Sequence, residues 1–139
     1  MNAASLRDGI RVLIVEDSPL TASQICEAIE KVQPEIRCSV VSTEFEALST
    51  IAQFMPQIVV LDLRLKVGTG FGVLNELQTA KQRPVTIVVT NYALPQIREF
   101  AFLRGADYFL DKAFSMDELP HILREVIQGP HSRTTSRTN

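Results

Sequence analysis

The chain has 139 residues, with 14 Lys and Arg against 16 Asp and Glu, and its formal net charge is −2. This length fits one domain. The near balance of charge argues against general nucleic-acid binding, which needs a basic surface. Hydrophobic residues make up 45% of the chain and charged residues 22%, a composition typical of a protein that folds around its own core.

Membrane and export signals are missing from the sequence. No apolar run approaches the roughly 20 residues that span a bilayer, and the N-terminal residues Met1 to Asp8 contain no apolar signal-peptide core. The two cysteines, Cys26 and Cys38, do not form a Cys-x-x-Cys pair, and both lie in apolar segments, where we expect buried, reduced thiols. We therefore expect a cytoplasmic protein that does not enter a membrane.

Short β-branched runs alternate with segments of helical spacing along the chain. The predicted strands are 11–15, 37–41, 58–61, 85–89 and 108–110. After each strand, apolar residues recur three or four positions apart, which predicts helices around 22–32, 45–55, 74–77, 97–101 and 119–127. Because strands and helices alternate, we expect a parallel sheet with right-handed crossovers and helices on both faces.

Helix-start signals agree with this division. Ser18 before Pro19 fits an N-cap followed by proline in the first turn. Two further pairs fit capping boxes: Thr43 with Glu46, and Ser115 with Glu118.

The end of the chain changes character after the last predicted helix. Residues 129–139 are Ser, Thr, Arg and Gly-rich without periodic apolar residues, so we expect a folded domain over 10–128 and a disordered tail over 129–139. That tail is too short for a helix-turn-helix output domain, so we expect that the output passes to another protein or that the chain only relays phosphate.

Polar residues follow the predicted strands where ligands bind in open α/β sheets, beyond the strands' carboxyl ends. They are Glu16, Asp17, Asp62, Thr90, Asn91 and Lys112. Each alone fits a turn or a solvated surface, but their repeated occurrence at one edge indicates a site. Crowded carboxylates repel one another and are usually neutralised by a cation.

The natural cation for such a site is Mg²⁺, which prefers carboxylate and carbonyl oxygens and often binds phosphate as well. A carboxylate beside Mg²⁺ can attack phosphorus. Lys112 would then stabilise charge on the transferred oxygens, and Thr90 could donate a hydrogen bond to one of them.

With these residues in place, the sequence resembles the receiver domain of two-component response regulators over roughly residues 10 to 128. The matching motifs are Val12-Leu-Ile-Val-Glu-Asp17, Leu61-Asp-Leu63 with Gly70 beyond it, Val88-Val-Thr90, and Gly105-Ala-Asp-Tyr-Phe-Leu-Asp-Lys112. The resemblance implies a flavodoxin-like, doubly wound (βα)5 fold with a five-stranded parallel sheet in the order 2-1-3-4-5.

The resemblance also implies roles for individual residues. Asp62 would be the phosphoacceptor, acting with Thr90 and Lys112 as the catalytic groups. Mg²⁺ would be bound by Asp17, Asp62 and the backbone carbonyl of Arg64, with Glu16 assisting through water. Thr90 and Phe109 would form the conformational switch.

Partners follow from the same resemblance. Phosphoryl groups would come from the phosphohistidine of a sensor histidine kinase or a histidine phosphotransfer protein, with self-catalysed phosphorylation and dephosphorylation and no metabolic turnover. The family's usual partner face would include Tyr92, Arg98, Phe102 and Tyr108, with Phe102 exposed. The protein would be a monomer or a phosphorylation-dependent dimer, and no nucleic acid partner is expected.

The chain departs from the usual family pattern after the lysine. Many receivers carry proline there, often with a cis peptide bond before it, whereas this chain has Ala113. A cis bond before a residue other than proline is unfavourable by about 3 kcal/mol. This cost favours a trans peptide bond between Lys112 and Ala113.

Two other functions compete with a phosphorylated switch. A receiver-like interaction module that works without phosphorylation is disfavoured by the intact set of acidic, hydroxyl and lysine residues. A metabolic phosphohydrolase commonly has a second Asp two residues after its nucleophile, where this chain has Arg64.

Overall fold

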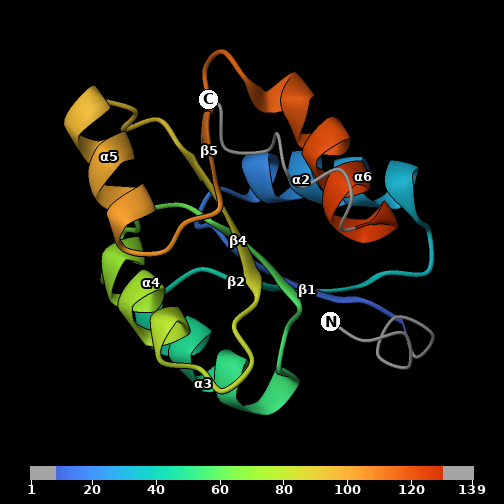
Figure 1. Ribbon diagram of the computed structural model, residues 1–139, viewed down its shortest axis with the longest axis horizontal. Helices are drawn as coiled ribbons and strands as arrows, with labels where there is room; N and C mark the ends of the chain where they lie inside the picture. Colours follow the sequence, from blue (N-terminus) through green and yellow to red (C-terminus); the bar gives the residue numbers. More distant parts are fainter. Residues whose placement is uncertain (1–8, 130–139) are drawn as a thin grey trace.

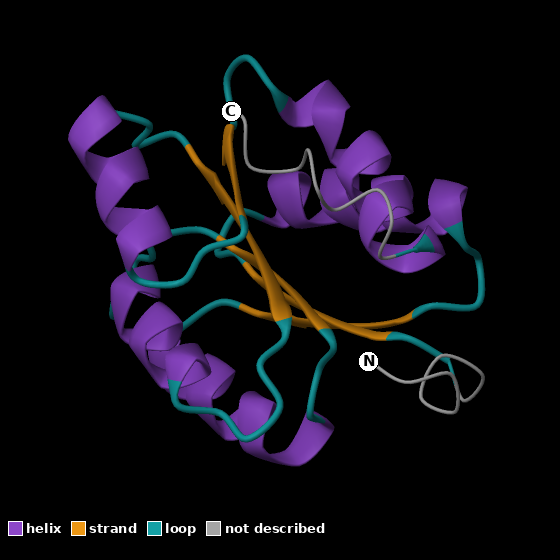
Figure 2. Cartoon of the chain, in the orientation of Figure 1, coloured by secondary structure: helices purple, strands orange, loops and turns teal. Residues whose placement is uncertain are grey.

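The five β-branched runs form one parallel sheet in the computed structural model, which describes residues 9–129. The strands are β1 (Arg11–Val15), β2 (Arg37–Val41), β3 (Ile58–Leu61), β4 (Val85–Thr90) and β5 (Tyr108–Asp111). Their order is β2-β1-β3-β4-β5, and every neighbouring pair is parallel (Figure 2). The expected flavodoxin-like order is therefore confirmed. The tail predicted over 129–139 lies outside the described residues apart from Gly129.

A helix follows each strand, and the helices cover both faces of the sheet. They are α2 (Pro19–Val32), α3 (Glu44–Phe54), α4 (Gly70–Gln78), α5 (Pro95–Leu103) and α6 (Leu119–Gln128), the last preceded by a 3₁₀ turn, η1 (Met116–Glu118). Figure 1 shows α3, α4 and α5 on one face, and α2 and α6 on the other. Between residues 9 and 129, every helix is too short or too polar to cross a membrane.

Two apolar clusters lie on the two faces of the sheet. Val12 and Ile14 belong to the cluster shared with α2 and α6, whereas Leu13 and Val15 belong to the cluster shared with α3, α4 and α5. All four side chains are fully buried. From Val12 to Val15, strand β1 is apolar because helices cover both of its faces.

The carboxyl ends of the strands meet at one edge of the sheet. Val15 at the end of β1 pairs with Leu61 at the end of β3. Sheet hydrogen bonds continue one residue further, because the N–H of Asp62 donates to the Val15 carbonyl at 3.0 Å and the N–H of Lys112 donates to the Thr90 carbonyl at 2.9 Å. Asp62 and Lys112 are therefore hydrogen-bonded to the neighbouring strand in the same way as the strand residues before them.

The predicted helix caps are only partly correct. Ser18 and Thr43 accept backbone hydrogen bonds as N-caps. Glu46 accepts the N–H of Ser42 at 3.1 Å, and hydrogen bonds from the backbone of Ser42 and Thr43 lower its pKa, as in the predicted capping box. The box predicted at Ser115 is wrong. At ψ 10° this residue lacks the extended backbone of an N-cap, its side chain makes no capping bond, and η1 forms first.

The prediction that Tyr108 lies on a partner face is also wrong. Its side chain is 5% exposed and belongs to the cluster shared with α2 and α6. The reason is that successive side chains of β5 alternate between two covered faces, so Phe109 is buried in the opposite cluster. Phe102, expected to be exposed, is half-buried, and its ring centroid lies 6.3 Å from that of Phe109. Phe100 is the exposed aromatic residue of α5, at 40%.

Cys38 differs from its prediction as well. It is exposed, whereas Cys26 is half-buried. Strand β2 lies at the edge of the sheet and pairs only with β1, and every residue of β2 is exposed or half-buried. An apolar sequence context was therefore a poor guide to burial at an edge strand.

The burial of Tyr108 can be tested by comparing two aromatic truncations. Tyr108→Ala is expected to lower the free energy of unfolding by about 3–5 kcal/mol, the range for large buried aromatic side chains. Phe114→Ala, at a ring that is 85% exposed, should change it by no more than about 0.5 kcal/mol. Urea unfolding measures both values, and equal small effects would contradict the buried position of Tyr108.

Candidate functional site

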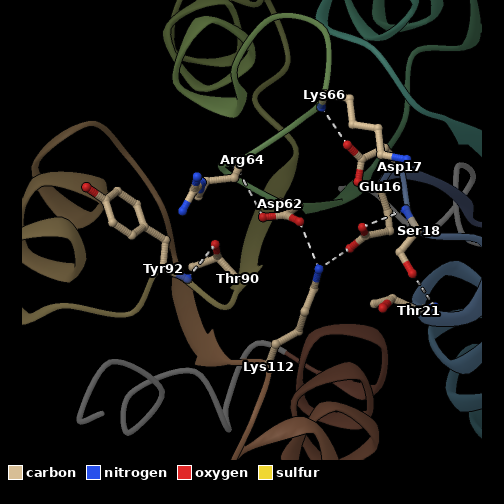
Figure 3. A network of polar contacts seen from close by, with 10 residues as sticks. All are labelled: Glu16, Asp17, Ser18, Thr21, Asp62, Arg64, Lys66, Thr90, Tyr92 and Lys112. Atoms are coloured by element: carbon tan, nitrogen blue, oxygen red, sulfur yellow. Dashed lines mark hydrogen bonds and ion pairs between the residues drawn. The ribbon is translucent and has the colours of Figure 1, made fainter.

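Four of the predicted site residues meet at the carboxyl edge of the sheet (Figure 3). Glu16 and Asp17 follow β1, Asp62 follows β3, and Lys112 follows β5. One ligand oxygen from each of the three carboxylates lies within 4.8 Å of the others. The structure therefore brings together groups that are up to 96 residues apart in the sequence, counted from Glu16 to Lys112.

Lys112 joins two of the carboxylates. Its Nζ lies 2.8 Å from Glu16 Oε1 and 2.8 Å from Asp62 Oδ2. The side chains of Glu16, Asp62 and Lys112 are only 1%, 6% and 11% exposed. These contacts are therefore screened far less by water and salt than a surface ion pair would be.

The buried position shifts the ionisation of both partners. Burial raises the pKa of Glu16, and this effect outweighs the contacts with Lys112 and with the N–H of Ser18 that lower it. For Lys112, burial alone would lower the pKa, but the hydrogen bond and charge of Asp62, together with those of Glu16, raise it. Lys112 therefore stays positively charged at neutral pH.

Backbone N–H groups orient the other two carboxylates. Asp62 Oδ1 accepts a hydrogen bond from the N–H of Arg64 at 3.0 Å, and Asp17 Oδ2 accepts one from the N–H of Lys66. The bond from Lys66 to Asp17 ties the loop after β3 to the loop after β1. The bond from Arg64 places the backbone of that residue, a predicted metal ligand through its carbonyl, beside Asp62.

The donor set fits a hard divalent cation. All side-chain donors are carboxylate oxygens, which Mg²⁺ prefers. When the three carboxylates are ionised, one ammonium leaves two negative charges uncompensated, the charge that one divalent cation neutralises. The residues predicted to bind Mg²⁺ therefore suit it in number, charge and chemistry.

Thr90 and Phe109 are the two residues predicted to form the conformational switch. Thr90 is fully buried at the end of β4, the neighbour of β3, and its hydroxyl accepts a hydrogen bond from the N–H of Tyr92 at 3.1 Å. Phe109 is 5% exposed and faces α5. The Lys112–Ala113 peptide bond is trans, as expected, since none of the bonds over residues 9–129 is cis. The switching roles themselves stay predictions.

The sequence predicted a role for the carbonyl of Arg64 but gave no indication of where its side chain lies. Its guanidinium lies over the ring of Tyr92, 5.1 Å from the centroid, on the opposite side of Asp62 from Lys112 (Figure 3). This is cation–π geometry. The two residues lie in different loops, and no local pattern in either loop indicates that they meet.

The fold and the site define an α/β domain with three carboxylates and a lysine gathered at the carboxyl edge of its parallel sheet. The family model of the response regulator receiver domain matches residues 12–124. The chain belongs to the response regulator receiver family.

Solved receiver domains have the same fold. The signal receiver domain of a putative Luxo repressor protein from Vibrio parahaemolyticus is 25% identical, with a TM-score of 0.77 over 86% of this chain and 91% of that one. The receiver domain of a sensor histidine kinase from Pseudomonas aeruginosa, solved with magnesium coordinated in its active-site cleft, is 26% identical. Its TM-score is 0.74 over 87% of this chain and 99% of that one.

Curated relatives are longer proteins. The regulatory protein AtoC of Escherichia coli is 28% identical over 118 residues, which are 85% of this chain and 25% of that protein. The DNA-binding dual master transcriptional regulator RpaA of Synechocystis is 28% identical over 120 residues, or 85% of this chain and 49% of that protein. The chain spans 25% to 60% of the length of four curated relatives that it matches, these two among them.

Cation binding predicts a thermal shift that depends on Asp17. At a Mg²⁺ concentration a hundredfold above the dissociation constant, binding to the folded state should add about 2.7 kcal/mol of stability. Asp17→Asn should lose most of this gain, as measured by melting temperature with and without Mg²⁺. Asp117→Asn, at an exposed position in η1, makes the same charge change and should keep the full gain. An equal loss in both variants would contradict a cation site at Asp17.

Proposed function

We propose that this receiver domain, over residues 10–128, is the phosphoacceptor of a two-component or phosphorelay system, and that Asp62 receives the phosphoryl group. The observation that carries this proposal is the position of the Asp62 carboxylate. It lies 2.8 Å from the Lys112 ammonium and within 4.8 Å of two further carboxylates. This arrangement fits a nucleophile that meets a phosphoryl group between a cation site and a lysine.

The transfer begins with the phosphohistidine of a donor protein. An oxygen of the Asp62 carboxylate attacks the phosphorus atom, a P–O bond forms, and the P–N bond to the donor imidazole breaks. The imidazole nitrogen leaves with the bonding electron pair and takes up a proton. In the later dephosphorylation step, water attacks the phosphorus of the aspartyl phosphate, which restores the carboxylate and releases inorganic phosphate.

The site residues act on the charge that develops during this transfer. The Lys112 ammonium, already beside Asp62, donates to a phosphoryl oxygen, and the Thr90 hydroxyl donates to another. Asp17, Asp62 and the Arg64 carbonyl would bind Mg²⁺, with Glu16 assisting through water. The bound cation would neutralise charge on the phosphoryl oxygens.

Thr90 would connect phosphorylation of Asp62 to a change at the partner face. In the structure the Thr90 hydroxyl accepts the N–H of Tyr92. A hydroxyl that turns toward the phosphoryl group gives up that bond, so the loop of Tyr92 and the packing of Phe109 would change together. The partner face we propose consists of Tyr92, Arg98 and Phe102, without the buried Tyr108.

The partners we propose are a sensor histidine kinase or a histidine phosphotransfer protein as donor, and a protein that reads the switched face. We propose the cytoplasm as the compartment of this exchange. The relative RpaA binds DNA as a longer protein, but the near-neutral charge of this chain supports a protein partner for the receiver domain itself. Monomer and phosphorylation-dependent dimer are both compatible with this function.

Phosphorylation at Asp62 can be measured with a small acyl phosphate as donor. In the presence of Mg²⁺, the intact mass of the wild-type protein should rise by one phosphoryl group, and chelation of the metal should prevent this gain. Asp62→Asn should show no gain because the amide is not a nucleophile, whereas Asp117→Asn should behave as wild type. Unmodified wild-type protein, with equal partner binding by Asp62→Asn, would favour an interaction module that works without phosphorylation.

A further inference from the structure

The loop between β3 and α4 reaches the site from an exposed position. Its residues 66–69 are exposed, yet the N–H of Lys66 holds the Asp17 carboxylate. The same loop carries Arg64, whose carbonyl is a predicted metal ligand. Gly68 adopts φ +83°, a conformation that favours glycine. Because this exposed loop positions Asp17, a contact that holds the loop in one conformation would also keep the site in place.

Glu44, the first residue of α3, makes that contact. Its N–H donates to the carbonyl of Val67 at 3.3 Å, and its Oε1 accepts the N–H of Thr69 at 2.8 Å. The residue therefore holds the loop through both its backbone and its side chain. A hydrogen bond to an ionised carboxylate is stronger than one between neutral groups.

Two glycines make room for this side chain. A Cβ atom at Gly68 would overlap the Cβ of Glu44, and a Cβ atom at Gly72 would overlap Glu44 Oε2. Both positions therefore lack a side chain where Glu44 lies. The carboxylate also sits at the N-terminus of α4, whose first turn has no acidic residue. A negative charge there is favourable because it faces the positive end of the helix dipole.

The pairing of Thr69 with Arg64 connects the Glu44–Thr69 hydrogen bond to the site. Thr69, held by Glu44, lies opposite Arg64 in an antiparallel bridge. Beside this bridge, the N–H of Gly70 donates to the carbonyl of Leu63 at 3.0 Å. Movement of Thr69 would therefore move the backbone of Arg64 and, through Lys66, the carboxylate of Asp17.

We propose that Glu44 is a positioning residue for the phosphoacceptor site: it fixes the loop after β3 so that the Arg64 carbonyl and Asp17 can bind a cation together. This inference rests on the proposed function. Glu44 itself would contact neither the metal nor the phosphoryl group. Its effect is on the geometry of the residues that make those contacts.

The first test compares three variants by Mg²⁺ affinity, measured by NMR titration, and by hydrogen exchange of the Thr69 N–H. Glu44→Ala should raise the Mg²⁺ dissociation constant about tenfold, the lower end of the effect of residues that support metal ligands, and should speed that exchange. Glu44→Gln keeps an acceptor oxygen and should restore most of the affinity. Glu46→Ala removes a carboxylate of the same helix that bonds only to Ser42 and Thr43, and should leave the affinity unchanged.

Gly72→Ala tests the same Glu44–Thr69 contact without changing Glu44. Its methyl group should push the flexible end of Glu44 away from Thr69 and weaken Mg²⁺ binding as Glu44→Ala does. In a chain that already carries Glu44→Ala, the same substitution should have no further effect. Such non-additivity is expected only of residues that act through one contact.

The outcomes separate this proposal from the function on which it rests. If Glu44→Ala lowers the free energy of unfolding but leaves the Mg²⁺ dissociation constant unchanged, Glu44 only joins two helices and the positioning proposal is wrong. The same conclusion follows if Glu44→Gln binds Mg²⁺ as poorly as Glu44→Ala, or if the two substitutions add. If the wild-type protein neither binds Mg²⁺ nor accepts a phosphoryl group, the proposed function itself fails.

Discussion

The Lys112 ammonium between two buried carboxylates is the interaction on which the site depends. Without this positive charge, Glu16 and Asp62 would place like charges together in a region largely closed to water, which is unfavourable. The ammonium compensates one of the three carboxylate charges, and two remain when all three carboxylates are ionised. We propose that this residual charge binds Mg²⁺ and, with it, a phosphoryl group.

The sheet makes this arrangement possible. Asp62 and Lys112 are bonded through their N–H groups to the neighbouring strands, so each side chain starts from a rigid point. Strands β1 and β3 are buried on both faces and leave little room for shifts in register. The loops beyond them are more exposed, and contacts between loops hold them: the N–H of Lys66 to Asp17, and Glu44 to Thr69. The sheet therefore holds Asp62 and Lys112 in place, whereas the side chains of Asp17 and Glu44 hold the exposed loop after β3.

Much of this could be predicted from the sequence, because continuous apolar runs such as 12–15 mark strands buried on both faces, and strand order then determines which ends meet. The acidic cluster and Lys112 were predicted by position alone. Predictions based on local pattern failed where the outcome depends on distant parts of the chain. Edge position exposes Cys38, and cover on both faces of β5 buries Tyr108. The Glu44–Thr69 contact joins segments 25 residues apart and has no local signature.

The central claim is that one carboxylate, that of Asp62, accepts the phosphoryl group. An acyl phosphate is reduced by borohydride to an alcohol, whereas a free carboxylate is not, so the reaction marks the acceptor permanently. After phosphorylation with a small acyl phosphate and Mg²⁺, followed by reduction, peptide mass spectrometry should find the altered residue at position 62 and at no other acidic residue. A mark at Glu16 or Asp17, or no mark in protein that has gained a phosphoryl group, would contradict the account.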